Sequence, residues 1–319
     1  MSDTGLLFFE VIPRETIWGG TKASSYFGYE VPDKTGQVWA FAAQPDGDTV
    51  CVRGRHAGKT LGELFQDAPE IFESRYDHFP FIISLVAPVD DLSIQVHPND
   101  EVARSLGYEH GKNEAWLLLE TEPEASLVYG LTKTVDEAVL RIRSGDIEGL
   151  FRTVPTSTGE FFYIPAGTVH ALGKGNVAYE VQQATDLTFR VYDYGRTDAD
   201  GNPRPLDTQH ALDTILASSK EINETLEFLH PLAKTKTIGR STITEHISND
   251  AFCITTIDVQ GAISITPTAY CLCTVVKGKG SVDGETVRFV DNFILPALHK
   301  EVSLRGVFTL TITSESSLM

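Results

Sequence analysis

The sequence has little cysteine, a deficit of positive charge and no long hydrophobic run. Its 4 cysteines include no CxxC pair, and this spacing argues against both a zinc ribbon and a secreted disulfide framework. No stretch approaches the roughly 18 consecutive apolar residues of a membrane-spanning helix. No basic segment followed by an apolar stretch of signal-peptide length is present near residue 1. We therefore expect a cytoplasmic protein with reduced thiols and no membrane partner.

The charge balance restricts the class of partner further. There are 26 lysines and arginines against 44 aspartates and glutamates, which gives a formal net charge of -18. A field of this sign opposes the close approach of nucleic acid or of an anionic bilayer. An anionic small molecule would need a local group of positive charges to overcome the same field. The sequence therefore favours a small-molecule partner and excludes nucleic acid, and it leaves the oligomeric state open.

Strand-like segments dominate the chain and helical signals are few. Thr60 with Glu63 and Thr134 with Glu137 are possible capping boxes, each followed by apolar residues at helical spacing. We predict a mainly β protein with helices inserted near residues 60–75, 134–151 and 207–217. The predicted strands are rich in β-branched and aromatic residues and include 79–87, 92–96, 115–119, 160–164 and 177–194, with four more between 251 and 313.

A weak sequence similarity between two parts of the chain predicts two similar β domains. The run from Gly159 to His170 and the run from Val290 to His299 both pass from an apolar strand into Pro-Ala and then a histidine. Each would be the descending strand of a small antiparallel barrel, because proline lacks the N–H that would continue the ladder. Two tandem antiparallel barrels would account for the length. We expect residues 1–235 to carry the functional site and residues 236–319 to form a β domain without metal ligands.

Three segments concentrate candidate metal ligands. Gln95 and His97 are two residues apart on a predicted strand, and this spacing points both side chains to one face. Glu114 opens another apolar strand, and His170 follows a Pro-Ala-Gly turn. Amide oxygen, imidazole and carboxylate suit Zn²⁺ or another borderline divalent ion, with room left for water or substrate. A single histidine is more often a surface or core residue than a metal ligand. The prediction therefore rests on the occurrence of all three segments in one sequence.

A specific family resemblance follows from several runs taken together. The runs are Ile17-Trp-Gly-Gly-Thr-Lys22, Asp91-Leu-Ser-Ile-Gln-Val-His-Pro98, Gly111-Lys-Asn-Glu114, Tyr163-Ile-Pro-Ala-Gly-Thr-Val-His-Ala171 and Arg190-Val-Tyr-Asp-Tyr194. They resemble the type I mannose-6-phosphate isomerases of the cupin superfamily, in particular their short bacterial form. The runs occur in the family order, and the resemblance extends over nearly the whole chain. It implies tandem cupin-like (jelly-roll) barrels and a zinc-dependent interconversion of mannose 6-phosphate and fructose 6-phosphate through an enediol.

The resemblance also implies roles for individual side chains. Lys112 and Arg190 would be catalytic and substrate-binding, with Arg190 steadying the enediolate or the phosphate. Glu180 would serve as the base or would support other active-site groups. Trp18 would contact the substrate or be structural. The ligands of one zinc ion per chain would be Gln95, His97, Glu114 and His170.

Two positions depart from the family pattern. Ser84, which we expect to line the substrate pocket, stands where family members usually carry a lysine, and Gln37 stands where a glutamate is usual. Together the changes delete one charge of each sign, as the loss of an ion pair would. A sugar isomerase of altered substrate, or a sugar-binding protein without activity, is therefore the alternative hypothesis. A metal-dependent oxygenase matches less well, because Gln95 would add a fourth protein ligand to the usual two histidines and one carboxylate.

Overall fold

The structure is a computed structural model that describes residues 5–318 except 55, 186, 199 and 298. The chain divides into two compact units. The first unit combines Met1–Ile12, Trp39–Ile83 and Pro231–Met319, and the second combines Pro13–Val38 and Ser84–His230. The C-terminal strands therefore share a unit with two earlier segments of the chain. The division into domains 1–235 and 236–319 stays a prediction.

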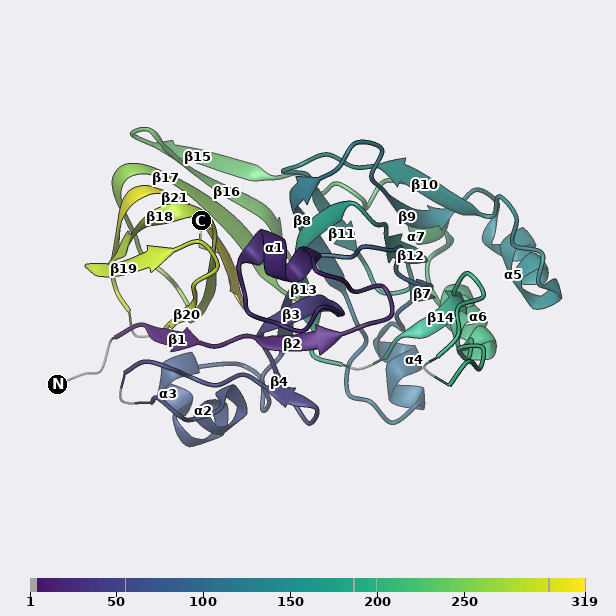
Figure 1. Ribbon diagram of the computed structural model, residues 1–319, viewed down its shortest axis with the longest axis horizontal. Helices are drawn as coiled ribbons and strands as arrows, with labels where there is room; N and C mark the ends of the chain where they lie inside the picture. Colours follow the sequence, from purple (N-terminus) through teal and green to yellow (C-terminus); the bar gives the residue numbers. More distant parts are fainter. Residues whose placement is uncertain (1–4, 55, 186, 199, 298, 319) are drawn as a thin grey trace. The chain divides into compact units, whose positions relative to one another are not determined.

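The second unit contains a five-stranded sheet, most of a six-stranded sheet and a group of helices (Figure 1). One sheet has the order β11 (Phe161–Ile164), β8 (Glu114–Thr121), β13 (Asn176–Gln183), β6 (Phe81–Val86), β3 (Thr35–Phe41) and β2 (Ile12–Glu15). The other has the order β10 (Phe151–Pro155), β9 (Ser126–Leu131), β12 (His170–Leu172), β7 (Ile94–Val96) and β14 (Phe189–Tyr192). The helices are α1 (Lys22–Phe27), α4 (Asp100–Ser105), α5 (Val135–Ser144), α6 (Thr208–Ala217) and α7 (Lys220–Glu224).

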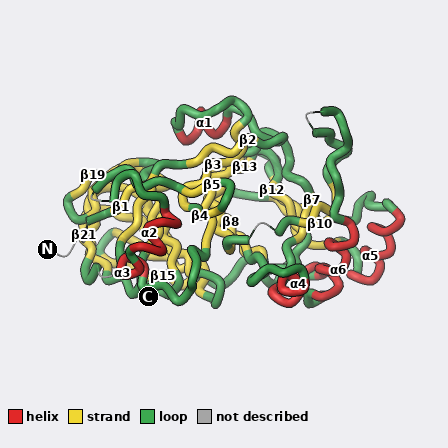
Figure 2. Tube along the Cα trace, turned by 90° about the horizontal axis from the view of Figure 1, so that it is seen from below, coloured by secondary structure: helices red, strands yellow, loops and turns green. Residues whose placement is uncertain are grey.

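Two hydrophobic clusters define the layers of the second unit. Trp116 and Leu118 of β8 pack with Tyr129 of β9 and Leu172 of β12, so the two sheets face each other across this cluster. A second cluster lies on the opposite face of the five-stranded sheet, where α5 and α6 cover β7, β12 and β14. Figure 2 shows the red helices α4, α5 and α6 gathered beside these strands. The space between the two sheets is therefore the interior, where a polar side chain needs a partner.

The first unit is mostly a long antiparallel sheet. The sheet has the order β1 (Leu7–Phe9), β20 (Asn292–Leu295), β18 (Cys271–Val282), β21 (Val302–Ser314), β17 (Cys253–Ile265), β16 (Ser241–Ser248) and β15 (Lys234–Ile238), with β19 (Glu285–Arg288) paired to β18. Most of the apolar residues in the core of this unit come from β17, β18, β20 and β21. The unit also contains the pair β4 (Ala43–Gln44) and β5 (Gly47–Asp48), and the helices α2 (Leu61–Asp67) and α3 (Pro69–Phe72).

The predicted helices form where their capping signals lie, although two end earlier than expected. The capping box of α2 is complete, because Thr60 and Glu63 each accept a hydrogen bond from the other's backbone N–H. The helix predicted for 134–151 ends at Ser144, because Gly145 adopts the left-handed conformation that caps a C-terminus. The segment 60–75 holds two short helices, and 207–217 holds α6. A mainly β protein with inserted helices is confirmed.

The strand predicted over 177–194 is wrong as a single element. The structure divides it into β13 in the six-stranded sheet and β14 in the five-stranded sheet. The polar residues Gln182, Gln183 and Thr185 interrupt the apolar alternation, and the chain crosses between the sheets after them. This crossing matters for the site because it places Glu180 and Arg190 on opposite sheets.

Among the described residues, no helix has the length and apolar character needed to span a membrane.

Candidate metal centre

The strand register places one row of side chains on the inner face of the five-stranded sheet. Gln95 of β7 lies opposite both His170 of β12 and Arg190 of β14. Directly opposed residues of antiparallel strands point to the same face. The two neighbours of Gln95, Ile94 and Val96, belong to the cluster beneath the helices, so Gln95 points the other way, toward the interior. Gln95, His170 and Arg190 therefore face the six-stranded sheet.

The facing sheet contributes Glu114, and four predicted ligands come together. His97 Nε2 lies 3.1 Å from Glu114 Oε1, and His170 Nε2 lies 3.3 Å from Glu114 Oε2. The amide nitrogen of Gln95 is 3.5 Å from His170 Nε2. His97, Glu114 and His170 are almost fully buried, with exposed fractions of 1%, 2% and 0%. The structure thus assembles the four side chains from three segments of the chain into one buried cluster.

Backbone carbonyls orient both imidazole rings. His97 Nδ1 lies 2.7 Å from the Leu187 carbonyl oxygen, and His170 Nδ1 lies 2.8 Å from that of Thr168. A carbonyl oxygen only accepts, so each Nδ1 carries the proton and donates it. Each Nε2 then presents a lone pair to the cluster. Such an outer hydrogen bond is the usual companion of a metal-binding histidine.

The imidazole and carboxylate groups of the cluster present electron pairs to one another. Neither imidazole Nε2 has a proton to give to the Glu114 carboxylate. His97 Nε2 and Glu114 Oε2 are buried with no hydrogen-bond partner among the described residues. Buried acceptors that face each other without a donor are costly. A divalent cation would satisfy all of them, so the residues fit a bound metal.

The electrostatics keep the ligands in their metal-binding protonation states. Burial lowers the pKa of His97 to about 4, so its ring is neutral near pH 7. Burial alone would raise the pKa of Glu114, but His97 and Lys112 lower it well below its usual range. Lys112 Nζ lies 3.1 Å from Glu114 Oε1 and its side chain is 8% exposed. Lys112 thus supplies a buried positive charge at the centre.

Glu180 lies on the same face of the six-stranded sheet as Glu114, but other side chains donate hydrogen bonds to it. The Trp116 indole N–H and the Gln182 amide each donate to one of its carboxylate oxygens, both at 2.9 Å. Burial and the charge of Glu114 raise the pKa of Glu180 to about 7. Ser84 of β6 is fully buried, and its hydroxyl is among the groups that lower this pKa. That hydroxyl makes no hydrogen bond of ordinary geometry within the described residues.

The other predicted site residues lie farther out. The side chain of Arg190 is 29% exposed, and its Nη1 is 3.9 Å from Asp207 Oδ2. Trp18 packs over Gly36 of β3 and against the core cluster between the sheets. Gln37 lies half-buried on β3, the neighbour of the strand that carries Ser84. Substrate contacts by Arg190, Trp18 and Ser84 stay predictions.

Sequence reasoning missed the residues that hold the site in place. Gln182 and Trp116 follow Glu180 and Glu114 by two residues on their strands, so alternation alone could have placed them on the same face. Asn113 accepts from the Tyr163 hydroxyl and from the Ala166 N–H. No local signal in the sequence distinguishes it from an ordinary loop asparagine.

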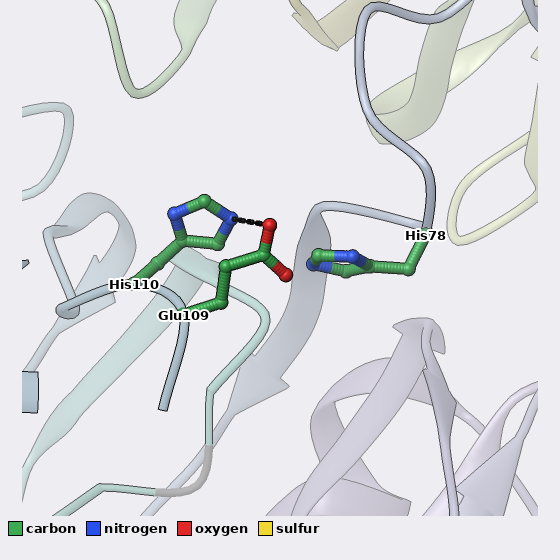
Figure 3. A group of neighbouring side chains, drawn as sticks. All are labelled: His78, Glu109 and His110. Atoms are coloured by element: carbon green, nitrogen blue, oxygen red, sulfur yellow. Dashed lines mark ion pairs between the residues drawn. The ribbon is translucent and has the colours of Figure 1, made fainter. Parts of the chain in front are cut away.

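A further group of potential ligands does not form a site within either unit. In the part of the chain that the structure describes, His97 with Glu114 and His170 is one of two such groups, and neither includes a residue after 235. Figure 3 draws the other, His78, Glu109 and His110. Glu109 and His110 are sequence neighbours whose side chains lie 3.7 Å apart, whereas His78 belongs to the first unit.

Comparison with known proteins identifies the family. The catalytic domain of type I phosphomannose isomerase matches residues 7–132. The chain is 35% identical over 318 residues to the putative mannose-6-phosphate isomerase YvyI of Bacillus subtilis, covering 96% of this chain and 98% of that protein. It is 36% identical over 309 residues to the mannose-6-phosphate isomerase ManA of the same organism, covering 94% and 96%.

A solved structure extends the match to the fold. The crystal structure of the mannose 6-phosphate isomerase from Bacillus subtilis superposes with a TM-score of 0.89 at 34% identity, covering 97% of this chain and 99% of that one. The prediction of tandem cupin-like antiparallel barrels is therefore confirmed. The chain belongs to the type I mannose-6-phosphate isomerases, a family of enzymes.

Proposed function

We propose that this protein interconverts mannose 6-phosphate and fructose 6-phosphate through an enediol and depends on one zinc ion per chain. The ligands would be Gln95, His97, Glu114 and His170. The observation that carries the proposal is the buried cluster in which two Nδ1-protonated imidazoles turn their lone pairs toward one carboxylate. These amide, imidazole and carboxylate ligands suit zinc as well as other borderline divalent ions, so the identity of the metal is part of the proposal.

The residues around the cluster support proton transfer. When bound, the cation supplies a Lewis acid for the negative charge that develops on the sugar oxygens. Aldose–ketose conversion moves a proton between C2 and C1, and Glu180 is a buried carboxylate able to accept and return it. Two donors fix its orientation, which a base that must serve two neighbouring carbons requires.

Positive charge near the interior supports binding of an anionic sugar. The formal net charge is -18, so recognition of a phosphate depends on local cations. Lys112 is buried at the cluster, and Arg190 faces the same interior from β14. Arg190 would steady the phosphate or the enediolate, and its buried Nε has no hydrogen-bond partner among the described residues. The small-molecule partner would thus be a sugar phosphate.

A cytoplasmic location is part of the proposal. The 4 cysteines are all free thiols and all buried, as expected in a reducing compartment.

Removal of the metal tests the proposal directly. Purified protein is expected to contain close to one equivalent of zinc and to convert mannose 6-phosphate to fructose 6-phosphate. Dialysis against a chelator should abolish turnover, and added Zn²⁺ should restore it. Elemental analysis and a coupled assay for fructose 6-phosphate measure both quantities. Turnover that persists in protein shown to be free of metal would rule out the proposed dependence.

Ser84 favours a second candidate, an isomerase of altered substrate or a sugar-binding protein without activity. Within the described part of the chain, its fully buried hydroxyl makes no hydrogen bond of ordinary geometry, and it brings no positive charge to the interior beside Glu180. If the lost lysine limits recognition of mannose 6-phosphate, the Ser84→Lys variant should raise kcat/KM for it about 10- to 100-fold, the effect of one charge-assisted contact.

The control for Ser84→Lys is Ser84→Met, which has a similar length and no charge. A panel of phosphorylated and free sugars assayed with the wild type and both variants measures the effect. Equal rates in the two variants would show that the missing charge does not limit turnover and would count against the second candidate.

A further inference from the structure

The turn that precedes His170 is tied directly to both imidazole ligands. The Thr168 carbonyl oxygen accepts the Nδ1 proton of His170, so its direction sets the rotation of that ring. One residue earlier, the Gly167 N–H donates to the His97 carbonyl oxygen at 2.7 Å. Any shift of this turn would therefore move one ligand and loosen the backbone of the other.

One buried side chain, from a helix that is distant in sequence, forms hydrogen bonds to the turn on both sides of Thr168. Asn223 of α7 is fully buried, and its Nδ2 donates to the Gly167 carbonyl oxygen at 2.8 Å. Its Oδ1 accepts from the Val169 N–H, also at 2.8 Å. The Asn223 amide thus donates to Gly167 and accepts from Val169, the two residues that flank Thr168. Aspartate would have the same shape but would lack the donor.

The approach of α7 to the turn depends on two glycines. A Cβ atom at Gly130 would collide with the backbone of Asn223, and a Cβ atom at Gly167 would collide with the side chain of Ser218. Both glycines also have positive φ, +69° and +93°. Only glycine at these positions allows α7, and Ser218 just before it, to lie close enough for the Asn223 amide to reach the turn.

The helix that carries Asn223 is itself anchored to its own unit. Glu224 Oε1 accepts the Val135 N–H at the start of α5, at 2.7 Å. Arg152 of β10 donates to the Glu224 and Thr225 carbonyl oxygens, at 2.8 and 3.1 Å. Contacts on either side of the helix fix α7, so Asn223 has a rigid base from which to hold the turn.

We infer that Asn223 is a positioning residue for the metal ligand His170: it locks the Gly167–Val169 turn, which aims the imidazole at Glu114, and it thereby sets the metal affinity of the centre. This inference deepens the proposed function and rests on its metal site. Asn223 itself contacts neither substrate nor metal. Loss of an outer hydrogen bond behind a ligand typically weakens metal binding 10- to 100-fold.

The test is Asn223→Asp, which keeps the side-chain shape and the contact to Val169 but places an acceptor against the Gly167 carbonyl. Asn176→Asp is the matched control. Asn176 is also fully buried in the second unit and its amide nitrogen also donates to two backbone carbonyls, those of Ser126 and Gly173. It lies at the start of β13, whereas the site residues Glu180 and Gln182 lie nearer the end of that strand.

Three measurements are made on each full-length variant: Zn²⁺ affinity by competition with a chromophoric chelator, the visible absorption of the Co²⁺-loaded protein, and the melting temperature. Asn223→Asp is expected to bind Zn²⁺ about 10- to 100-fold more weakly and to shift the Co²⁺ bands. Asn176→Asp is expected to lower the melting temperature while leaving affinity and bands as in the wild type. If Asn223→Asp does not fold, Asn223→Ser with Asn176→Ser as its control takes the same tests.

The outcomes distinguish a failure of the positioning role of Asn223 from a failure of the proposed metal site. Unchanged affinity and unchanged Co²⁺ bands in the Asn223 variant overturn the positioning role and leave the metal site standing. An equal loss of affinity in the Asn176 variant also overturns it, because the effect would then be general loosening. A wild-type protein that binds neither metal at the cluster removes the proposed metal site, and the positioning role falls with it.

Discussion

Replacement of Glu114 by glutamine is expected to empty the metal centre and to lower kcat/KM about 1,000-fold. Among the described residues, Glu114 is the one carboxylate grouped with His97 and His170, and glutamine keeps its shape while removing its charge. Lys112 would then be left buried without its nearest partner charge. Loss of Lewis-acid assistance worth about 4 kcal/mol corresponds to about three powers of ten in rate.

Elemental analysis and steady-state kinetics on the same Glu114→Gln preparation measure the two effects together. Glu101→Gln, an exposed carboxylate on α4 of the same unit, is the control and should keep both metal and activity. Circular dichroism shows whether the variant is folded. A folded Glu114→Gln protein with a full equivalent of zinc and normal turnover would exclude Glu114 as a ligand.

The sequence predicts the grouping of the candidate ligands because its signals are local. Gln95 and His97 share a face because two residues on a strand repeat the direction of the side chain, and no knowledge of the fold is needed for that. His170 follows a Pro-Ala-Gly turn that ends one strand and begins the next. What brings these segments together is the family's fold, which the resemblance supplied and the strand register then made explicit.

The parts that the sequence did not predict depend on contacts between distant segments. The crossing between β13 and β14 cannot be seen in a run of alternating residues, because both halves have strand character. Backbone carbonyls orient the rings of His97 and His170. Every residue has a carbonyl, so the sequence does not show which one lies beside each ring. Asn223 lies on a helix that was not predicted, 53 residues beyond His170.

Glu180→Gln is expected to keep the metal and to lower kcat about 100- to 10,000-fold, the usual contribution of a general base. Glutamine fills the same space and can still accept from Trp116, so the fold and the cluster of ligands should survive. It cannot take a proton from the sugar carbon. The combination of full zinc content with slow turnover would separate the role of Glu180 from that of Glu114.

The pH profile provides an independent check on Glu180. Burial and the charge of Glu114 raise its pKa from an ordinary 4.5 to about 7 in the metal-free protein, and a bound divalent cation would lower it again. A base must be ionised, so kcat/KM of the zinc enzyme should fall as the pH drops through a value between these two. That limb should disappear in Glu180→Gln and persist in Glu120→Gln, an exposed carboxylate on β8. If Glu180→Gln retained the wild-type rate and the wild-type acidic limb, another group would have to move the proton between C1 and C2. The hydrogen bond from Trp116 to Glu180 would then serve the packing of β8 against β13 instead.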